Sequence, residues 1–184
     1  DNCGNTADFI QTINVVDNTD PVISSSLLDL TVECDAVPAG DLTTASASDN
    51  CDTDVVISFV DVILGGSCTD EYTITRTYTA TDNCGNTADF IQTITAEDTS
   101  DPTLSGVPSD ATVECSSIPS APIIGTDITS SDNCDTDAAI TFVETIVPSA
   151  CGSTVTRTWT ATDDCGNSTS EAQTITAEDT TNPI

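Results

Sequence analysis

Carboxylates are the chemistry-bearing side chains that dominate this 184-residue sequence, and they recur in short Asp-rich segments such as DNCDTD and AEDTSDP. They are hard oxygen ligands, and the chain has no His to add ring nitrogens. Ca²⁺ takes about six to eight such oxygens. The candidate metal ligands are Asp17, Asp20, Asp49, Asp52, Asp54, Asp82, Glu97, Asp98, Asp101, Asp132, Asp135, Asp137 and Asp163.

The nine cysteines form the second chemical group. No C-x-x-C spacing occurs and there is no His, so zinc is the weaker interpretation. The better interpretation is that the cysteines form disulfides. Disulfides indicate an oxidising location, so we expect a secreted protein that is extracellular or at the cell surface. We expect eight cysteines to be bonded and Cys3 to be left without a partner; the eight are Cys34, Cys51, Cys68, Cys84, Cys115, Cys134, Cys151 and Cys165.

The charge balance excludes several partners. Thirty-one acidic residues stand against two basic ones, Arg76 and Arg157, which gives a net charge of −29. Nothing neutralises phosphates, so nucleic acid and anionic membrane surfaces are excluded. No apolar run is long enough for direct membrane insertion. With no His or Lys, and with carboxylates repeated along the chain, the sequence predicts no enzyme.

The elements that must position these residues are set by a repeat. The thirteen letters of Asp1–Ile13 recur unchanged at Asp82–Ile94 and more loosely at Asp163–Ile175. A period of this size means a tandem array of one domain. Pro-containing linkers place the boundaries. We expect residues 1–17 to be the C-terminal hairpin of a preceding repeat, 18–98 to be repeat A, 99–179 repeat B, and 180–184 the start of a following repeat.

Short alternating runs rich in Thr, Val and Ile predict strands, and no helical period competes with them. Regular spacing of such strands is typical of an antiparallel β-sandwich in each repeat, hence an all-β fold. A further short strand should precede residue 30. The strands expected in repeat A cover residues 30–34, 43–47, 55–63, 72–81 and 88–96.

The stretch TYTATDNCGNTADFIQTITAEDT (Thr77–Thr99) resembles the last hairpin of HYR-like (hyalin-type) immunoglobulin-like repeats. Its cysteine-bearing context, TVEC…DNC…C…DNCGN, is similar to repeats of very large cell-surface proteins of Bacteroidetes, including gliding-motility adhesins. The resemblance covers both repeats. It implies tandem immunoglobulin-like domains in an elongated array with a role in cell adhesion. The cysteine positions depart from the common hyalin pattern, so its disulfides do not transfer.

The pairing of cysteines can be argued from the sandwich. In an immunoglobulin-like domain the loops between the second and third strands and between the last two strands lie at one end. One of these loops contains Cys51 and the other Cys84, whereas Cys34 and Cys68 belong to the opposite end. The expected bonds are Cys34–Cys68 and Cys51–Cys84, and in repeat B Cys115–Cys151 and Cys134–Cys165.

The linker that enters a repeat should lie beside those same two loops. This would gather the candidate ligands of each linker and its loops into one acidic joint, where Ca²⁺ would relieve the repulsion between carboxylates and stiffen the array. The alternative is that Asp and Asn serve only as turn residues. For the two arginines we expect a structural role, stacked on Tyr78 or Trp159 or paired with a nearby carboxylate. The candidate carboxylates are Glu33 or Asp61 in repeat A and Glu114 or Glu144 in repeat B.

These features together predict structural spacer repeats of a long adhesin or extracellular filament. Two alternatives remain. The repeats themselves could bind glycans or surfaces, or the chain could assemble with other copies into a fibre or sheath. In every case the nearest partners are neighbouring repeats of the same chain.

Overall fold

The computed structural model describes residues 2–182; residue 1 and residues 183–184, to which parts of the predicted terminal segments 1–17 and 180–184 belong, lie outside it. The described chain is all-β, with strands and short 3-10 turns and no α-helix in residues 2–182. No helix of this part is long and apolar enough to cross a membrane. The predicted all-β fold is therefore confirmed.

Repeat A forms two sheets, one with the strand order β1-β3 and one with the order β2-β6-β5-β4. Because β1 joins the first sheet and β2 runs parallel to β6 in the second, the start of the domain is divided between the two layers, as in an immunoglobulin-like sandwich. The strands are β1 (Val22–Ser25), β2 (Leu30–Glu33), β3 (Ala45–Ser48), β4 (Val56–Gly65), β5 (Tyr72–Thr81) and β6 (Thr87–Glu97).

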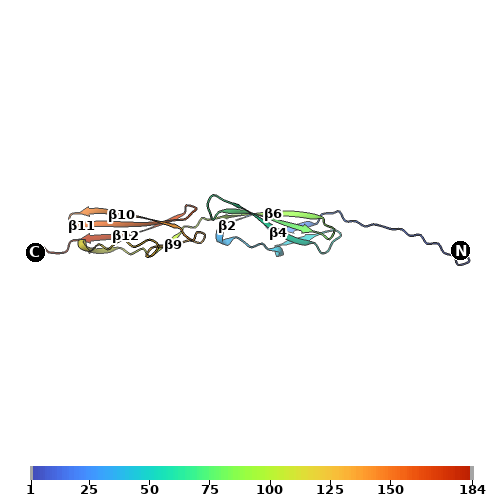
Figure 1. Ribbon diagram of the computed structural model, residues 1–184, viewed down its shortest axis with the longest axis horizontal. Helices are drawn as coiled ribbons and strands as arrows, with labels where there is room; N and C mark the ends of the chain where they lie inside the picture. The colour runs from blue at the N-terminus through green and yellow to red at the C-terminus, as the bar shows by residue number, and fades with distance from the viewer. Residues whose placement is uncertain (1, 183–184) are drawn as a thin grey trace. The chain divides into compact units, whose positions relative to one another are not determined.

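Repeat B repeats this arrangement with the sheets β7-β9 and β10-β11-β12-β8, and Figure 1 shows its long strands side by side. A short 3-10 turn, η3 (Cys115–Ser117), follows β8, just as η1 (Cys34–Ala36) follows β2. The strands are β7 (Thr103–Ser105), β8 (Ala111–Glu114), β9 (Thr129–Ser131), β10 (Ala139–Ser149), β11 (Gly152–Thr162) and β12 (Ser168–Glu178).

The predicted strands of repeat A are confirmed with small changes at their ends. At the strand predicted for residues 43–47, the chain first makes the 3-10 turn η2 (Leu42–Thr44) and the strand begins only at Ala45. The carboxylate of Asp41 causes this, because it accepts hydrogen bonds from both the backbone N–H and the hydroxyl of Thr43.

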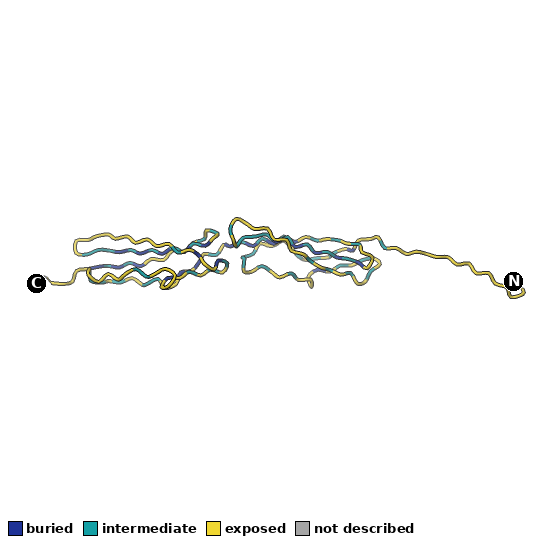
Figure 2. The backbone as a smooth tube through the Cα atoms, viewed as in Figure 1, coloured by how far each residue is buried: buried dark blue, intermediate teal, exposed yellow. Residues whose placement is uncertain are grey.

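Alternation along β5 and β11 builds each core. Every second residue of these strands is buried, with threonines on the other face. Tyr78 packs between Phe59 and Phe90, with ring centroids 5.8 Å and 6.3 Å apart. The fully buried Trp159 has Phe142 at 5.2 Å. In Figure 2 the described residues before β1, by contrast, form an almost wholly exposed segment that belongs to no strand.

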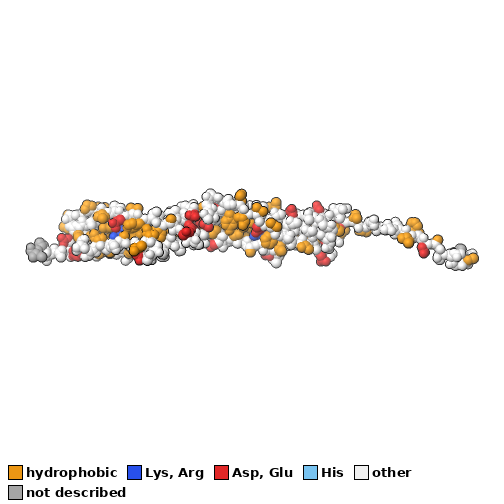
Figure 3. All heavy atoms as spheres, viewed as in Figure 1, with side chains coloured by type: hydrophobic (Ala, Val, Ile, Leu, Met, Phe, Trp, Pro, Cys, Tyr) orange, Lys and Arg blue, Asp and Glu red, His pale blue; other side chains and the backbone are white. Residues whose placement is uncertain are grey.

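The two arginines also belong to the buried face. Arg76 donates two hydrogen bonds to the carboxylate of Asp61, at 2.8 and 2.9 Å, and Arg157 pairs with Glu144 at 2.7 Å. Arg157 also donates to the carbonyl of Pro119 at 2.7 Å, so it ties the loop after η3 to the sheet. Both blue patches in Figure 3 lie against red ones. Carboxylate pairing, one of the two predicted roles, is thus found with Asp61 and Glu144. The other candidates, Glu33 and Glu114, accept hydrogen bonds from threonines instead.

The chain divides into two compact units whose boundary does not follow the predicted repeats. The first unit contains Asp1–Leu28, Gly40–Val60 and Thr77–Gln92, and the second contains Asp29–Ala39, Asp61–Arg76 and Thr93–Ile184. One end of repeat A therefore belongs to the same unit as repeat B. We keep the names repeat A and repeat B for residues 18–98 and 99–179, boundaries that stay a prediction.

Candidate acidic site and disulfide joint

The turn between the last two strands of each repeat fixes one carboxylate. Asp82 lies almost buried at this turn and accepts hydrogen bonds from the backbone of Cys84 and from both nitrogens of Asn86. Burial raises the pKa of Asp82, but these hydrogen bonds outweigh it and leave the pKa lowered. Gly85 closes the turn at a φ of +91°, a conformation that favours glycine. Asp163, Gly166 and Asn167 repeat the arrangement.

A second carboxylate comes from the loop between β3 and β4, or between β9 and β10. One oxygen of Asp49 accepts from the backbone N–H groups of Cys51 and Asp52, and Asp132 does the same for Cys134 and Asp135. The hydrogen bond from Cys51 lowers the pKa of Asp49. The other oxygen of Asp49 is buried and has no hydrogen-bond partner. Each loop thus spends one oxygen on its own turn and leaves the other available.

The linker supplies the third carboxylate. In the first unit, Asp17, Asp49 and Asp82 have carboxylate oxygens that all lie within 4.8 Å of one another. We call these three residues the first acidic cluster. Asn86 helps to place the linker, since its amide donates to the backbone carbonyl of Asp17 at 3.4 Å. The predicted gathering of linker and loops is therefore seen for these three residues.

Asp98, Asp132 and Asp163 stand at the corresponding positions in the second unit, and we call them the second acidic cluster because the charges of Asp132 and Asp163 act on Asp98. Asp98 is only 4 % exposed, and burial, followed by the charges of Asp132 and Asp163, raises its pKa. One oxygen accepts from Ser100, and the other is buried with no partner. Leaving an ionised oxygen buried and unpaired is unfavourable. This orphaned oxygen is the observation that distinguishes the cluster from an ordinary set of turn residues.

The donor set fits a hard divalent cation. Three carboxylates converge in the first cluster, and no ring nitrogen competes because the chain has no His. Asp17 and Asp49 each hold one oxygen in a turn, and Asp82 accepts hydrogen bonds through both. A cation there would pair with the free oxygens of Asp49 and Asp98. Two other groups of possible ligands, one with Cys68 and Cys165 and one with Cys134, rely on sulfur atoms that are bonded in disulfides. Those groups do not fit a metal.

The remaining predicted ligands do other work or show no described contact with the clusters. Asp52 accepts from both the backbone and the side chain of Asn83, which ties two loops together, and Asp135 does the same through Asp164. Asp101 accepts from the backbone of Ser168. The residues outside both clusters are Asp20, Asp52, Asp54, Glu97, Asp101, Asp135 and Asp137. Whether any of them binds metal stays a prediction.

Sequence reasoning missed two acidic residues near the second cluster. Glu33 contributes to the raised pKa of Asp98 and accepts hydrogen bonds from both the backbone and the hydroxyl of Thr99. Burial raises the pKa of Asp70, with the charges of Asp135 and Asp164 adding to it. The shared TVEC motif marks Glu33, but no local signal marks Asp70, because it comes from the β4–β5 hairpin turn.

The predicted disulfides are wrong. Among the described residues, Cys34 is bonded to Cys134 and Cys68 to Cys165, with Cα atoms 5.8 and 5.1 Å apart. This excludes Cys34–Cys68 and Cys134–Cys165. Cys51–Cys84 and Cys115–Cys151 do not form either, since these four residues are free thiols. The error was to close every bond within one repeat. Cys34 and Cys68, at one end of repeat A, are instead bonded to Cys134 and Cys165 of repeat B.

We call the set of contacts around these bonds the joint; all of it lies in the second unit. It contains the two disulfides, the hydrogen bonds from Thr99 to Glu33, and a hydrogen bond of 3.1 Å from the hydroxyl of Thr69 to Asp164. Asn167 donates to the carbonyl of Asp98 at 3.1 Å. The second acidic cluster is thus enclosed by residues from both repeats.

Comparison with known proteins gives a partial match. No curated protein matches the chain. Among solved structures, the protocadherin gammaB4 extracellular domain is 17 % identical over 88 % of this chain and 34 % of its own, with a TM-score of 0.34. A protocadherin gammaB7 EC3-6 cis-dimer structure is 14 % identical over 88 % of this chain and 51 % of its own, with a TM-score of 0.30. The chain thus spans about a third to a half of these structures.

The family comparison is confined to repeat A. It supports the resemblance to HYR-like repeats for this part of the chain, and the organism group stays a prediction. Residues 22–96, with Cys34, Cys51, Cys68 and Cys84 among them, match the family model described as an HYR-like domain with 4 cysteines.

Proposed function

We propose that the chain is a spacer segment of an extracellular surface protein or filament, and that it works mechanically rather than as an enzyme. The observation that carries this proposal is the pair of disulfides that join residues of repeat A to residues of repeat B. A disulfide closed within a domain stabilises only that domain against unfolding. Bonds closed between repeats instead fix how one repeat follows the next, which is what a spacer requires.

The covalent chemistry supports a location outside the cell. Disulfides persist in oxidising compartments and are rare in the cytosol. The net charge of −29 keeps such a chain soluble and separate from anionic surfaces. The match of residues 22–96 to an HYR-like domain is in keeping with an adhesion-type extracellular repeat.

Calcium has a defined place in this proposal. At the second acidic cluster, Asp98, Asp132 and Asp163 would hold the ion together with water molecules, and at the first cluster Asp17, Asp49 and Asp82 would do so. The ion would supply the positive charge that neither cluster obtains from the protein, since both arginines pair with other carboxylates. It would thereby offset the repulsion within each cluster.

Small-angle scattering of the 184-residue chain tests this function under four conditions, oxidised or reduced and with Ca²⁺ or with EDTA. We expect one rigid particle in the oxidised calcium form, a modest increase in flexibility with EDTA, and a large one on reduction. A chain that is equally flexible in all four conditions would refute a spacer function. If flexibility increases on reduction but not with EDTA, the spacer function stands and the proposed role of calcium is refuted.

A second function, lateral assembly with other copies, is favoured by one observation. Strands β4 and β10 lie at the edges of their sheets, and each exposes apolar side chains. Val60, Val62 and Leu64 on β4 are 65, 63 and 73 % exposed. Exposed apolar edge strands promote pairing with other chains.

Sedimentation velocity over a hundredfold range of concentration tests the assembly, with Val62→Lys as the disrupting variant and Thr73→Lys on β5 as the control. Assembly predicts larger species that the β4 variant abolishes and the control retains. A single species at every concentration would exclude it. Binding of glycans stays a prediction that no contact in the described residues addresses.

A further inference from the structure

The joint combines cysteines from the end of repeat A with cysteines from two loops of repeat B. Each of these two halves occurs once more in the chain, without its partner half. The loops that face repeat A in the joint carry Cys134 and Cys165, and the same loops of repeat A carry Cys51 and Cys84. The cysteines that repeat A contributes are Cys34 and Cys68, and repeat B has Cys115 and Cys151 at the corresponding positions. The four counterparts are exposed free thiols, whereas the four joint cysteines are bonded and partly buried.

The loop half on repeat A is already arranged as in the joint. Asn86 contacts the carbonyl of Asp17 as Asn167 contacts that of Asp98, and Asp52 ties the loops as Asp135 does. A cavity of about 210 Å³ lies there, lined by Val15, Asp17, Cys51, Asp52, Asn83 and Cys84. Both free thiols thus line a single depression whose equivalents in repeat B are covered by Cys34 and Cys68.

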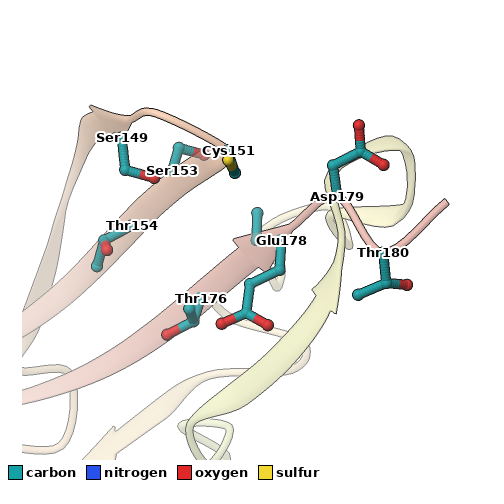
Figure 4. A pocket seen from close by; sticks show the side chains of 9 residues that line it. Ser149, Cys151, Ser153, Thr154, Thr176, Glu178, Asp179 and Thr180 are labelled. Carbon is teal, nitrogen blue, oxygen red and sulfur yellow. The ribbon is translucent and has the colours of Figure 1, made fainter. Parts of the chain in front are cut away.

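The other half, on repeat B, is arranged in the same way. The hydroxyl and backbone of Thr180 donate to Glu114, as those of Thr99 donate to Glu33 in the joint. The sulfur of Cys115 lies 3.9 Å from the backbone carbonyl oxygen of Cys151. A cavity of about 290 Å³ opens beside Cys151, and Figure 4 shows Glu178, Asp179 and Thr180 on its other side.

We propose that these two half-joints are disulfide docking sites for a further repeat of the same kind in the same polypeptide. A following repeat would bond Cys115 through the cysteine equivalent to Cys134, and Cys151 through the one equivalent to Cys165. A preceding repeat would bond Cys51 and Cys84 through its equivalents of Cys34 and Cys68. The rule is that every cysteine of a repeat bonds outside it. This inference concerns the bonding pattern and does not depend on calcium.

The chemistry balances with a disulfide oxidant. Two thiols lose two protons and two electrons to form each bond, and oxidised glutathione or a dithiol–disulfide oxidoreductase accepts them by two successive exchanges and becomes a pair of thiols. A full joint therefore needs two equivalents of the oxidant. The Cα separations of 5.8 and 5.1 Å in the existing joint are ordinary for disulfides, so a repeat placed in the same way would meet the geometric requirement.

The test extends the chain by one repeat. A second copy of residues 99–179 is inserted after Asp179, with Thr136→Ser and Ser168→Thr as mass markers, and the protein is refolded with oxidised glutathione. Non-reducing peptide mapping locates the bonds, and maleimide labelling of the native protein followed by mass spectrometry counts thiols. We expect Cys115 and Cys151 to be bonded to the marked peptides. We also expect the number of free thiols to equal that of the 184-residue chain, although four cysteines have been added.

The matched control carries Cys134→Ser and Cys165→Ser in the inserted copy only. Cys115 and Cys151 should then stay reduced and the thiol count should rise by two. Bonds within one repeat, such as Cys115–Cys151 in the extended protein, would overturn the proposal. Bonds to a marked peptide of another chain, seen after refolding a mixture of isotope-labelled and unlabelled protein, would overturn the assignment to the same polypeptide. The unextended chain decides independently, since bonding within repeats would leave none of Cys51, Cys84, Cys115 and Cys151 reactive toward maleimide.

Discussion

The two acidic clusters consist of equivalent residues in different surroundings. The first, Asp17 with Asp49 and Asp82, stands at a repeat end whose cysteines are free; the second, Asp98 with Asp132 and Asp163, lies inside a joint closed by two disulfides. Asp17 is half-buried, whereas Asp98 is 4 % exposed and its pKa is raised. The turns are alike in both places. The difference therefore comes from the joint, where residues of both repeats surround Asp98.

The largest effect should separate bonded from free cysteines. We expect the pair Cys34→Ser and Cys68→Ser to lower the free energy of unfolding by about 8 kcal/mol, because two bonds are lost and each closes a loop of roughly 100 residues. The pair Cys51→Ser and Cys84→Ser, at the first cluster, should change it by less than about 0.5 kcal/mol. Urea denaturation of the oxidised proteins measures both. Equal losses would mean that the two ends do not differ.

A somewhat smaller effect should be the same in both repeats, because it lies away from the clusters. Arg76→Ala and Arg157→Ala each remove a buried cation and leave its carboxylate partner unpaired. We expect each to lower the free energy of unfolding by about 3 kcal/mol. Arg→Lys at each site should recover part of the loss, since the ammonium keeps the charge but not the paired hydrogen bonds. Thermal and urea unfolding measure the four variants. A loss in one repeat only would show that the repeats differ beyond the joint.

Calcium should act more strongly at the joint than at the open cluster. At a Ca²⁺ concentration about thirtyfold above its dissociation constant we expect a stabilisation of about 2 kcal/mol relative to EDTA. Asp98→Asn should abolish most of this increment and should also stabilise the calcium-free protein, because it removes a buried unpaired charge. Asp17→Asn should do less of both. Calorimetry with and without EDTA gives these differences, and identical behaviour of the two variants would contradict the comparison.

The smallest effect is the pH dependence of stability that comes from the ion pair between Arg76 and Asp61. The hydrogen bond from Arg76 lowers the pKa of Asp61 below its ordinary 3.8, burial opposing it. A carboxyl group whose pKa is lower in the folded state adds stability above its unfolded pKa and loses it as the pH falls through the folded value. The loss should therefore begin as the pH approaches 3.8. Unfolding measured from pH 7 to pH 2 should show this component in the native chain and not in Asp61→Asn.

Much of the fold follows from local sequence patterns. The alternating runs gave the strands of repeat A to within a few residues, because burial of one strand face fixes a period of two. The arginine partners were among those expected, since Arg76 and Arg157 are the only cations. Three of the predicted ligands, Asp17, Asp49 and Asp82, also come together, because linker and loops meet at one end of a sandwich.

The disulfides could not be predicted by treating each repeat as a closed unit. Cys34 and Cys68 were correctly assigned to one end and Cys51 and Cys84 to the other, and pairing within an end was the natural assumption. In a tandem array, however, one end of a repeat meets the opposite end of the next. The same reasoning explains why Glu33 and Asp70 were missed, as both approach the second cluster from the other repeat.

The bonding pattern also defines a path for load. Starting at Cys84, covalent bonds follow β5 to Cys68, cross to Cys165 and follow β11 to Cys151. Residues in strands already rise about 3.2–3.4 Å each, close to the limit of about 3.3–3.6 Å for a stretched chain. Tension applied along this path therefore finds almost no slack to release. The other strands would bear little of the pull, and the two central strands would behave as links of a tether that can be severed but hardly lengthened.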